Sequence, residues 1–158
     1  MNTVELQITD CDYSNPDHLK AVVELLNAYI ADEMGGGEPL SPVKGLHLVD
    51  GLNNHPSSIV LLARVENVFA GMLVGFVNFS TFTVKPMVNI HDLIVRCEYR
   101  KKGIARALMD TVIQRAKEKG CSRVTLEVRK DNIAAQCLYK TIGFAETDPE
   151  MYYWRKNI

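Results

Sequence analysis

The chain alternates between stretches whose apolar residues recur at helical spacing and stretches whose apolar residues alternate or run together as in strands. Helical spacing predicts helices over residues 16–30, 42–52, 103–119 and 135–142. Strand patterns predict strands over residues 4–8, 59–65, 69–84, 88–95, 124–128 and 151–155. Strands dominate the first half, and a strand–helix–strand–helix–strand order follows. This order predicts an α/β fold with three layers, α/β/α, around a mixed sheet.

Local residues set several of these boundaries. Ser14 or Asn15 can cap the first helix, because Pro16 then occupies its first turn. Gly120 is expected to end the third helix. Three consecutive glycines, Gly35 to Gly37, follow the first helix, and we expect residues 31–45 to form part of a substrate site and to change order on binding. An idle surface loop explains the same glycines nearly as well.

The strongest chemical signal is the turn between the strand that ends at Val95 and the helix that follows. Five of the eleven residues from Arg96 to Arg106 are cationic. Helix N-termini are electropositive and carry unpaired N–H groups, so they favour anions and disfavour crowded cations. One glycine, Gly103, allows the backbone to approach a ligand closely. The pattern therefore predicts a phosphate or pyrophosphate site.

The single glycine in this turn excludes two common phosphate-binding motifs. A P-loop needs Gly-Lys-Ser/Thr after an earlier glycine, and a dinucleotide fingerprint needs three glycines. Neither pattern is present. The remaining pattern, Arg100-x-x-Gly103-x-Ala105, resembles the pyrophosphate loop of the GNAT N-acetyltransferase family. Residues 132–144 resemble a second segment of that family, Asn-x-x-Ala-x-x-Leu/Phe-Tyr-x-x-x-Gly-Phe.

The resemblance implies an acyl-CoA N-acyltransferase fold with a mostly antiparallel central sheet, and acetyl-CoA as acyl donor. It implies that the Val95 N–H faces the thioester oxygen and that backbone amides of the turn hold the pyrophosphate, with added charge from Arg100 and Arg106. The cofactor-binding residues that it implies are Leu93, Ile94, Val95, Arg100, Lys101, Lys102, Gly103, Ile104, Ala105, Arg106, Asn132 and Ala135. Asn132 is also the natural N-cap of the last helix, and we prefer that role for its side chain.

Amine acylation by direct attack requires a neutral amine, donors for the oxyanion and a group that protonates or hydrogen-bonds the departing thiolate. Tyr139 is the candidate acid, since a phenol is protonated at neutral pH; a core aromatic is the alternative. His91 is the first candidate base, Asp92 and Glu127 are further candidates, and water is the remaining option. Strand periodicity places His91 on the face of Leu93 and Val95, with Asp92 and Ile94 opposite.

Composition limits the other classes of function. The 158 residues fit a single domain, 1–158, and a net charge of −1 argues against a nucleic-acid surface. The cysteines have no paired spacing, the histidines have no ligand spacing, and no apolar run is long enough to cross a bilayer. The N-terminus lacks the pattern of a signal peptide. We therefore expect a cytoplasmic protein with no metal and no membrane partner.

Two classes of function fit these features. The first is an N-acetyltransferase that acts on a primary amine, either a small molecule or a peptide, and that can assemble as a homodimer. The second is a non-catalytic acyl-CoA-binding module that acts as a sensor or interaction partner. Tyr139 favours the enzyme, because a pure binding module has no need of a positioned acid.

Overall fold

The computed structural model describes residues 5–158. Contacts divide the chain into a first compact unit that ends at Glu127 and a second that begins at Val128. The first unit contains β1 (Leu6–Asp10), α1 (Pro16–Ile30), α2 (Pro42–Asn54), β2 (Ser58–Val65), β3 (Val68–Ser80), β4 (Lys85–Val95), a 3-10 turn (Cys97–Tyr99), α3 (Ile104–Glu118) and β5 (Val124–Leu126). The second unit contains α4 (Ile133–Ile142). The first strand was predicted from Val4, which lies outside the described residues.

The strands form one sheet in the order β1-β2-β3-β4-β5. Each neighbouring pair is antiparallel except β4 and β5, which are parallel. Short turns connect the antiparallel neighbours β2, β3 and β4, whereas α3 provides the crossover that a parallel pair requires. The predicted mixed, mostly antiparallel sheet is therefore confirmed.

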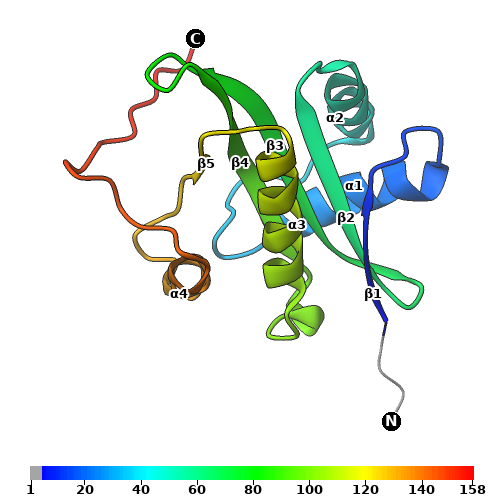
Figure 1. The fold of residues 1–158 in the computed structure, drawn as a ribbon. Coiled ribbons are helices and arrows are strands. Elements are labelled where there is room, and N and C mark those ends of the chain that lie inside the picture. The colour runs from blue at the N-terminus through cyan, green and yellow to red at the C-terminus, as the bar shows by residue number, and fades with distance from the viewer. Residues whose placement is uncertain (1–4) are drawn as a thin grey trace. The chain divides into compact units, whose positions relative to one another are not determined.

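Helices cover both faces of this sheet within the first unit, as Figure 1 shows. One face carries the helices α1 and α2, and its core consists of Cys11, Val22, Leu25, Leu52, Val60, Leu62, Met72, Val74 and Ile94. The opposite face carries α3, whose Ile104 and Leu108 are buried. A Cβ atom built on Gly71 would lie 3.1 Å from Ile104 Cγ2, so this glycine allows α3 to pack closely on β3. The predicted three-layer arrangement is confirmed in this unit.

Side-chain caps fix where the helices begin. Asn15 accepts a hydrogen bond from the Asp17 amide at 2.9 Å, and a proline follows this cap. Ser41 caps α2 in the same way through the Lys44 amide at 3.3 Å. Of the two caps predicted for the first helix, Asn15 is the one observed.

The second unit is built around α4. Asn132 accepts a hydrogen bond from the Ala135 amide at 3.2 Å, which confirms its role as N-cap. Gly143 ends the helix with φ 105°, a left-handed conformation that glycine adopts without strain.

The strand predicted for residues 151–155 is wrong. Its large side chains, from Met151 to Trp154, are between 72% and 89% exposed. A strand is stabilised by ladder hydrogen bonds and by a packed face. Among the described residues this segment has neither, so its apolar pattern does not produce a strand and its aromatic side chains are not core residues.

Candidate active site

The strands β4 and β5 separate shortly after they meet. Their ladder joins residues 88–90 to residues 124–126, whereas β4 continues to Val95 along β3. In the described part of the chain, residues 91–95 therefore have an edge with no strand partner. Such an edge presents N–H and C=O groups to which an extended ligand can hydrogen-bond.

The hydrogen bonds at the end of β4 show which peptide groups face this edge. The Arg96 amide donates to the Ala70 carbonyl of β3 at 2.9 Å. Successive residues of a strand direct their peptide groups to opposite sides, so those of Val95 and Leu93 point away from β3. The Val95 carbonyl confirms this orientation, because it accepts a hydrogen bond from Arg100 Nε at 3.1 Å. The free edge thus contains the Val95 N–H.

A β-bulge lies where β4 and β5 separate. Val74 pairs with Asp92 and Gly75 pairs with Ile90, which leaves His91 as an extra residue. Bulges are common beside active sites, because they redirect a side chain.

The bulge changes the face on which His91 lies. The imidazole ring is 4.9 Å from the ring of Phe76, which packs against the core on the α1 and α2 face. Ile94 belongs to the same core. The prediction that His91 lies opposite Ile94 is therefore wrong, because strict alternation along the strand fails at the bulge.

Asp92 follows the bulge and is half-buried. Burial raises the pKa of its carboxyl group above the ordinary value, while the charge of His91 acts in the opposite direction. A carboxylate with a raised pKa is a better proton acceptor. Two of the predicted base candidates, His91 and Asp92, therefore lie next to the unpaired edge.

The turn after β4 adopts the backbone conformation of an anion site. Lys101 and Gly103 both have positive φ, 60° and 82°. Gly103 precedes the first residue of α3, and no side chain caps this helix. A Cβ atom on Gly103 would meet no atom within 4 Å, so the space above this residue is open. The first amides of α3 lack acceptors within the helix and can bind an anion there.

The side chains of α3 differ in their roles at this site. Ile104 is 2% exposed and packs against the sheet, so only its amide can serve a ligand. Ala105 is half-buried and Arg106 is exposed. Because Ile104 is buried at the first position of α3, it holds the start of this helix against the sheet.

Carboxylates neutralise the arginines around the turn. Arg100 pairs with Asp32 at 2.6 Å, and Arg106 pairs with Asp110 at 3.2 Å. The Lys102 ammonium lies 5.1 Å from the centroid of the Tyr99 ring. Among the described residues, neither Lys101 nor Lys102 forms an ion pair with a carboxylate.

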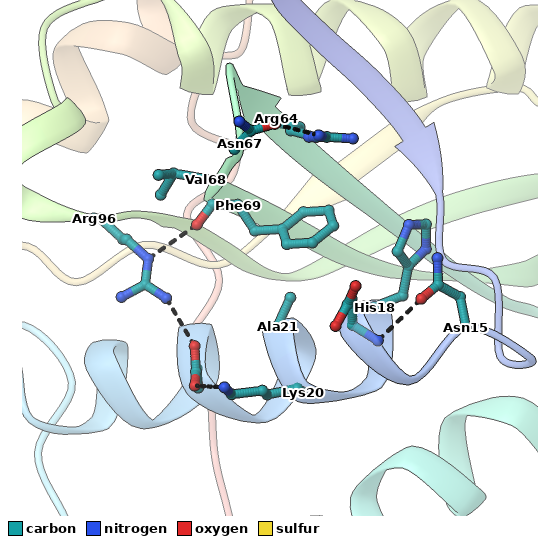
Figure 2. A pocket seen from close by; sticks show the side chains of 11 residues that line it. Asn15, His18, Lys20, Ala21, Arg64, Asn67, Val68, Phe69 and Arg96 are labelled. Atoms are coloured by element: carbon teal, nitrogen blue, oxygen red, sulfur yellow. Dashed lines mark hydrogen bonds and ion pairs between the residues drawn. The ribbon is translucent and has the colours of Figure 1, made fainter.

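Arg96 connects the same turn to α1. Its Nε donates to the Phe69 carbonyl at 2.9 Å, and its guanidinium pairs with Glu24 at 3.2 Å. Figure 2 shows Arg96 at one wall of a hollow of about 410 Å³, which also involves His18 and Arg64. None of the predicted site residues lines this hollow, so it is distinct from the candidate active site.

The structure divides the predicted residues between the two units. The first unit brings together residues 91–95 and 100–106 at the unpaired edge and the turn. Asn132, Ala135 and Tyr139 belong to the second unit, where the Tyr139 ring lies 6.0 Å from the Phe144 ring. Sequence reasoning missed Asp32, which pairs with Arg100 of the turn.

In the described part of the chain, no helix is both long and apolar enough to cross a membrane.

Comparisons with known proteins connect this geometry to a family. The model of the "Acetyltransferase (GNAT) family" matches residues 22–144. N-acetyltransferase 8 of Homo sapiens is 34% identical over 92 residues, which cover 58% of this chain and 40% of that protein. The [Ribosomal protein bS18]-alanine N-acetyltransferase of Escherichia coli K12 is 31% identical over 74 residues, which cover 47% of this chain and 50% of that protein. The chain thus matches half or less of the length of these relatives.

A solved aminoglycoside acetyltransferase from an uncultured soil metagenomic sample has the same fold, with a TM-score of 0.77 and 24% identity. The likeness covers 96% of this chain and 97% of that one. The family model spans the bulge, the turn and the Tyr139 segment, which together contain all the residues predicted for the site. The chain belongs to the acetyltransferase (GNAT) family.

Proposed function

We propose that this chain transfers an acetyl group from acetyl-CoA to a primary amine by direct attack. The observation that carries the proposal is the continuity of two ligand-binding features. The unpaired edge of β4 ends at Val95, and the open, positively charged turn before α3 begins at the next residue. An extended acyl-CoA arm and its pyrophosphate need these two features in this order.

The residues present fit an acyl-CoA donor. The open space above Gly103 leaves room for a pyrophosphate against the first amides of α3. The Val95 N–H points to the free edge, where it can donate to a thioester oxygen and stabilise the oxyanion of a tetrahedral intermediate. These features support acetyl-CoA as the acyl donor expected from the sequence.

The acid and base roles follow from the chemistry. The amine nitrogen attacks the thioester carbon and loses a proton, and the C–S bond then breaks. Asp92 is the base that the structure favours, because burial raises the pKa of its carboxyl group, and His91 at the bulge is the alternative. Tyr139 supplies a proton or a hydrogen bond to the departing thiolate.

The acceptor that we propose is a primary amine of a small molecule or a peptide. The names of two similar proteins support both kinds of acceptor. One acts on the alanine of a ribosomal protein, and the other acts on aminoglycosides. We therefore expect the acceptor to be found among amino-terminal peptides, aminoglycosides and polyamines.

Release of free CoA tests this function. The protein is incubated with acetyl-CoA and each amine, and the new thiol is measured over time. We expect release that depends on one class of amine.

Tyr139→Phe keeps the ring and removes only the hydroxyl group, so it should lower kcat by about 10²–10⁴-fold with nearly unchanged CoA affinity.

Two outcomes contradict the proposal. Binding of acetyl-CoA without turnover of any amine favours the non-catalytic sensor instead. Full activity of Tyr139→Phe assigns Tyr139 to the packing of α4 and removes it from the reaction.

A further inference from the structure

The side chain of Arg100 donates two hydrogen bonds to other residues of the chain. Its Nε donates to the Val95 carbonyl at 3.1 Å, and its terminal nitrogen donates to Asp32 Oδ2 at 2.6 Å. The planar guanidinium therefore spans the end of β4 and the segment that follows α1. A lysine cannot make both contacts in this way, because its ammonium is a point charge on a flexible chain.

Asp32 is built into the structure rather than solvated. Its side chain is 20% exposed, and its second oxygen accepts a hydrogen bond from the Met34 amide at 3.0 Å. The Met34 amide and the Arg100 guanidinium lower the pKa of the Asp32 carboxyl group, so Asp32 is ionised at neutral pH. A carboxylate two residues beyond the C-terminus of α1 faces the negative end of the helix dipole, which Arg100 offsets.

The segment that carries Asp32 is itself anchored to α1. Asn27 accepts a hydrogen bond from the Leu40 amide at 2.7 Å, and the Gly36 amide donates to the Ile30 carbonyl at 3.1 Å. A second arginine of the turn, Arg96, pairs with Glu24 of α1. Asp32 thus offers Arg100 a fixed anchor.

We propose that Asp32 is a positioning residue for acetyl-CoA binding, which acts by holding Arg100 on the Val95 carbonyl and thereby fixing the turn against the end of β4. This inference rests on the proposed function. The contact satisfies the carbonyl at the end of the free edge and leaves the Val95 N–H and the amides after Gly103 for the acyl donor. Lys101 and Lys102, which pair with no carboxylate in the part of the chain that the structure describes, then supply positive charge at the turn.

The positioning role and a simple charge effect predict opposite changes in CoA affinity when Asp32 loses its charge. CoA is an anion, so removal of any nearby carboxylate should strengthen its binding if charge alone matters. Asp110 provides the matched control, because it pairs with Arg106 at 3.2 Å and is 57% exposed. Asp32→Asn and Asp110→Asn remove the same charge, but only the first releases Arg100 from its anchor.

The experiment is a calorimetric titration of CoA into the wild-type protein, Asp32→Asn, Asp110→Asn, Arg100→Lys and the double variant Asp32→Asn/Arg100→Lys. We expect Asp32→Asn and Arg100→Lys each to raise Kd by about five- to tenfold. The double variant should lose no more CoA affinity than either single variant, because both substitutions break the same contact between Asp32 and Arg100. Asp110→Asn should bind CoA as tightly as the wild type, or more tightly.

Steady-state kinetics provides a readout that a loss of stability would not reproduce. Asp32→Asn should raise KM for acetyl-CoA and leave kcat within about twofold at saturation. Equal CoA affinities of Asp32→Asn and Asp110→Asn overturn the inference, as do additive losses in the double variant. If Asp32→Asn does not fold, unchanged CoA affinity of Arg100→Lys overturns it. Absence of CoA binding by the wild type instead refutes the proposed function.

Discussion

Asp92 lies at the unpaired edge of β4, and its surroundings raise the pKa of its carboxyl group. Burial makes its charged form less favourable, and the nearby His91 imidazole offsets this only in part. The bulge brings the His91 side chain to the face of α1 and α2, on which regular alternation already places Asp92 together with Ile94. This combination of burial and an adjacent titratable group is common for a general base.

The pH dependence of the reaction tests this assignment. A base must lose its proton, so kcat/KM should rise with pH through the pKa of Asp92, above the ordinary value of 3.8. Asp92→Asn should lower kcat/KM by about 10²–10⁴-fold and remove this limb of the profile. An unchanged limb in Asp92→Asn would show that another group or water is the base.

Stability provides the control for the same variant. The pKa of Asp92 is higher in the folded protein than in the unfolded chain, because burial disfavours the charged carboxylate. Its contribution to stability is therefore complete below pH 3.8 and is lost as the pH rises through the folded pKa. A neutral asparagine should be at least as stable as Asp92 at pH 7, and thermal melting checks this.

Single residues also show where sequence reasoning succeeds and where it fails. Asn132 could be identified as an N-cap because its partner, the Ala135 amide, is three residues away. The role of Asp32 could not be identified, because Arg100 is 68 residues distant in the chain. A contact of that kind depends on the completed fold, whereas a helix cap depends on one turn of chain.

The helices and most strands were predictable because their periodicity is local. The bulge at His91 was not, since it arises from the register between β3 and β4. The strand expected over residues 151–155 fails for a related reason, because an apolar pattern alone does not supply a partner strand. The turn between β4 and α3 lies where the sequence predicts it, whereas the shape of its backbone, with positive φ at Lys101, was not predicted.

The end of α1 allows a test at the level of an element. We expected Gly35 to lie in a loop that changes order on binding, but a Cβ atom at this position would lie 1.9 Å from the Tyr29 carbonyl oxygen. Gly35→Ala should therefore lower the free energy of unfolding by about 1–3 kcal/mol, measured by urea denaturation. Gly51→Ala is the control, because a Cβ there meets no atom within 4 Å and alanine favours the helix α2 by about 0.5–1 kcal/mol.

Wild-type stability of Gly35→Ala would show that the segment after α1 moves freely, as the interpretation as a flexible loop requires. A substantial loss would show that Gly35 is needed for close packing against α1. This packing is also what gives Asp32 its fixed position beside Arg100.

At the scale of the whole molecule, a net charge of −1 is combined with a cluster of cations confined to one turn. If the proposed function holds, this distribution of charge directs acetyl-CoA to the start of α3 without making the whole surface basic. The chain belongs to the acetyltransferase (GNAT) family, as its motifs indicated. The single domain over residues 1–158, the cytoplasmic location and the homodimer stay predictions, and sedimentation of the purified protein tests the last of these.

Calorimetry of two glycine variants tests whether acetyl-CoA binds at the turn before α3. Gly103 and Gly120 lie at opposite ends of α3, both have positive φ, and a Cβ atom on either meets no atom within 4 Å. A valine at either position should therefore cost similar backbone strain. Only Gly103→Val places a side chain in the space predicted for the pyrophosphate. We expect Gly103→Val to weaken acetyl-CoA binding by about tenfold or more, and Gly120→Val to bind acetyl-CoA like the wild type. Equal acetyl-CoA affinities of the two variants would contradict this expectation.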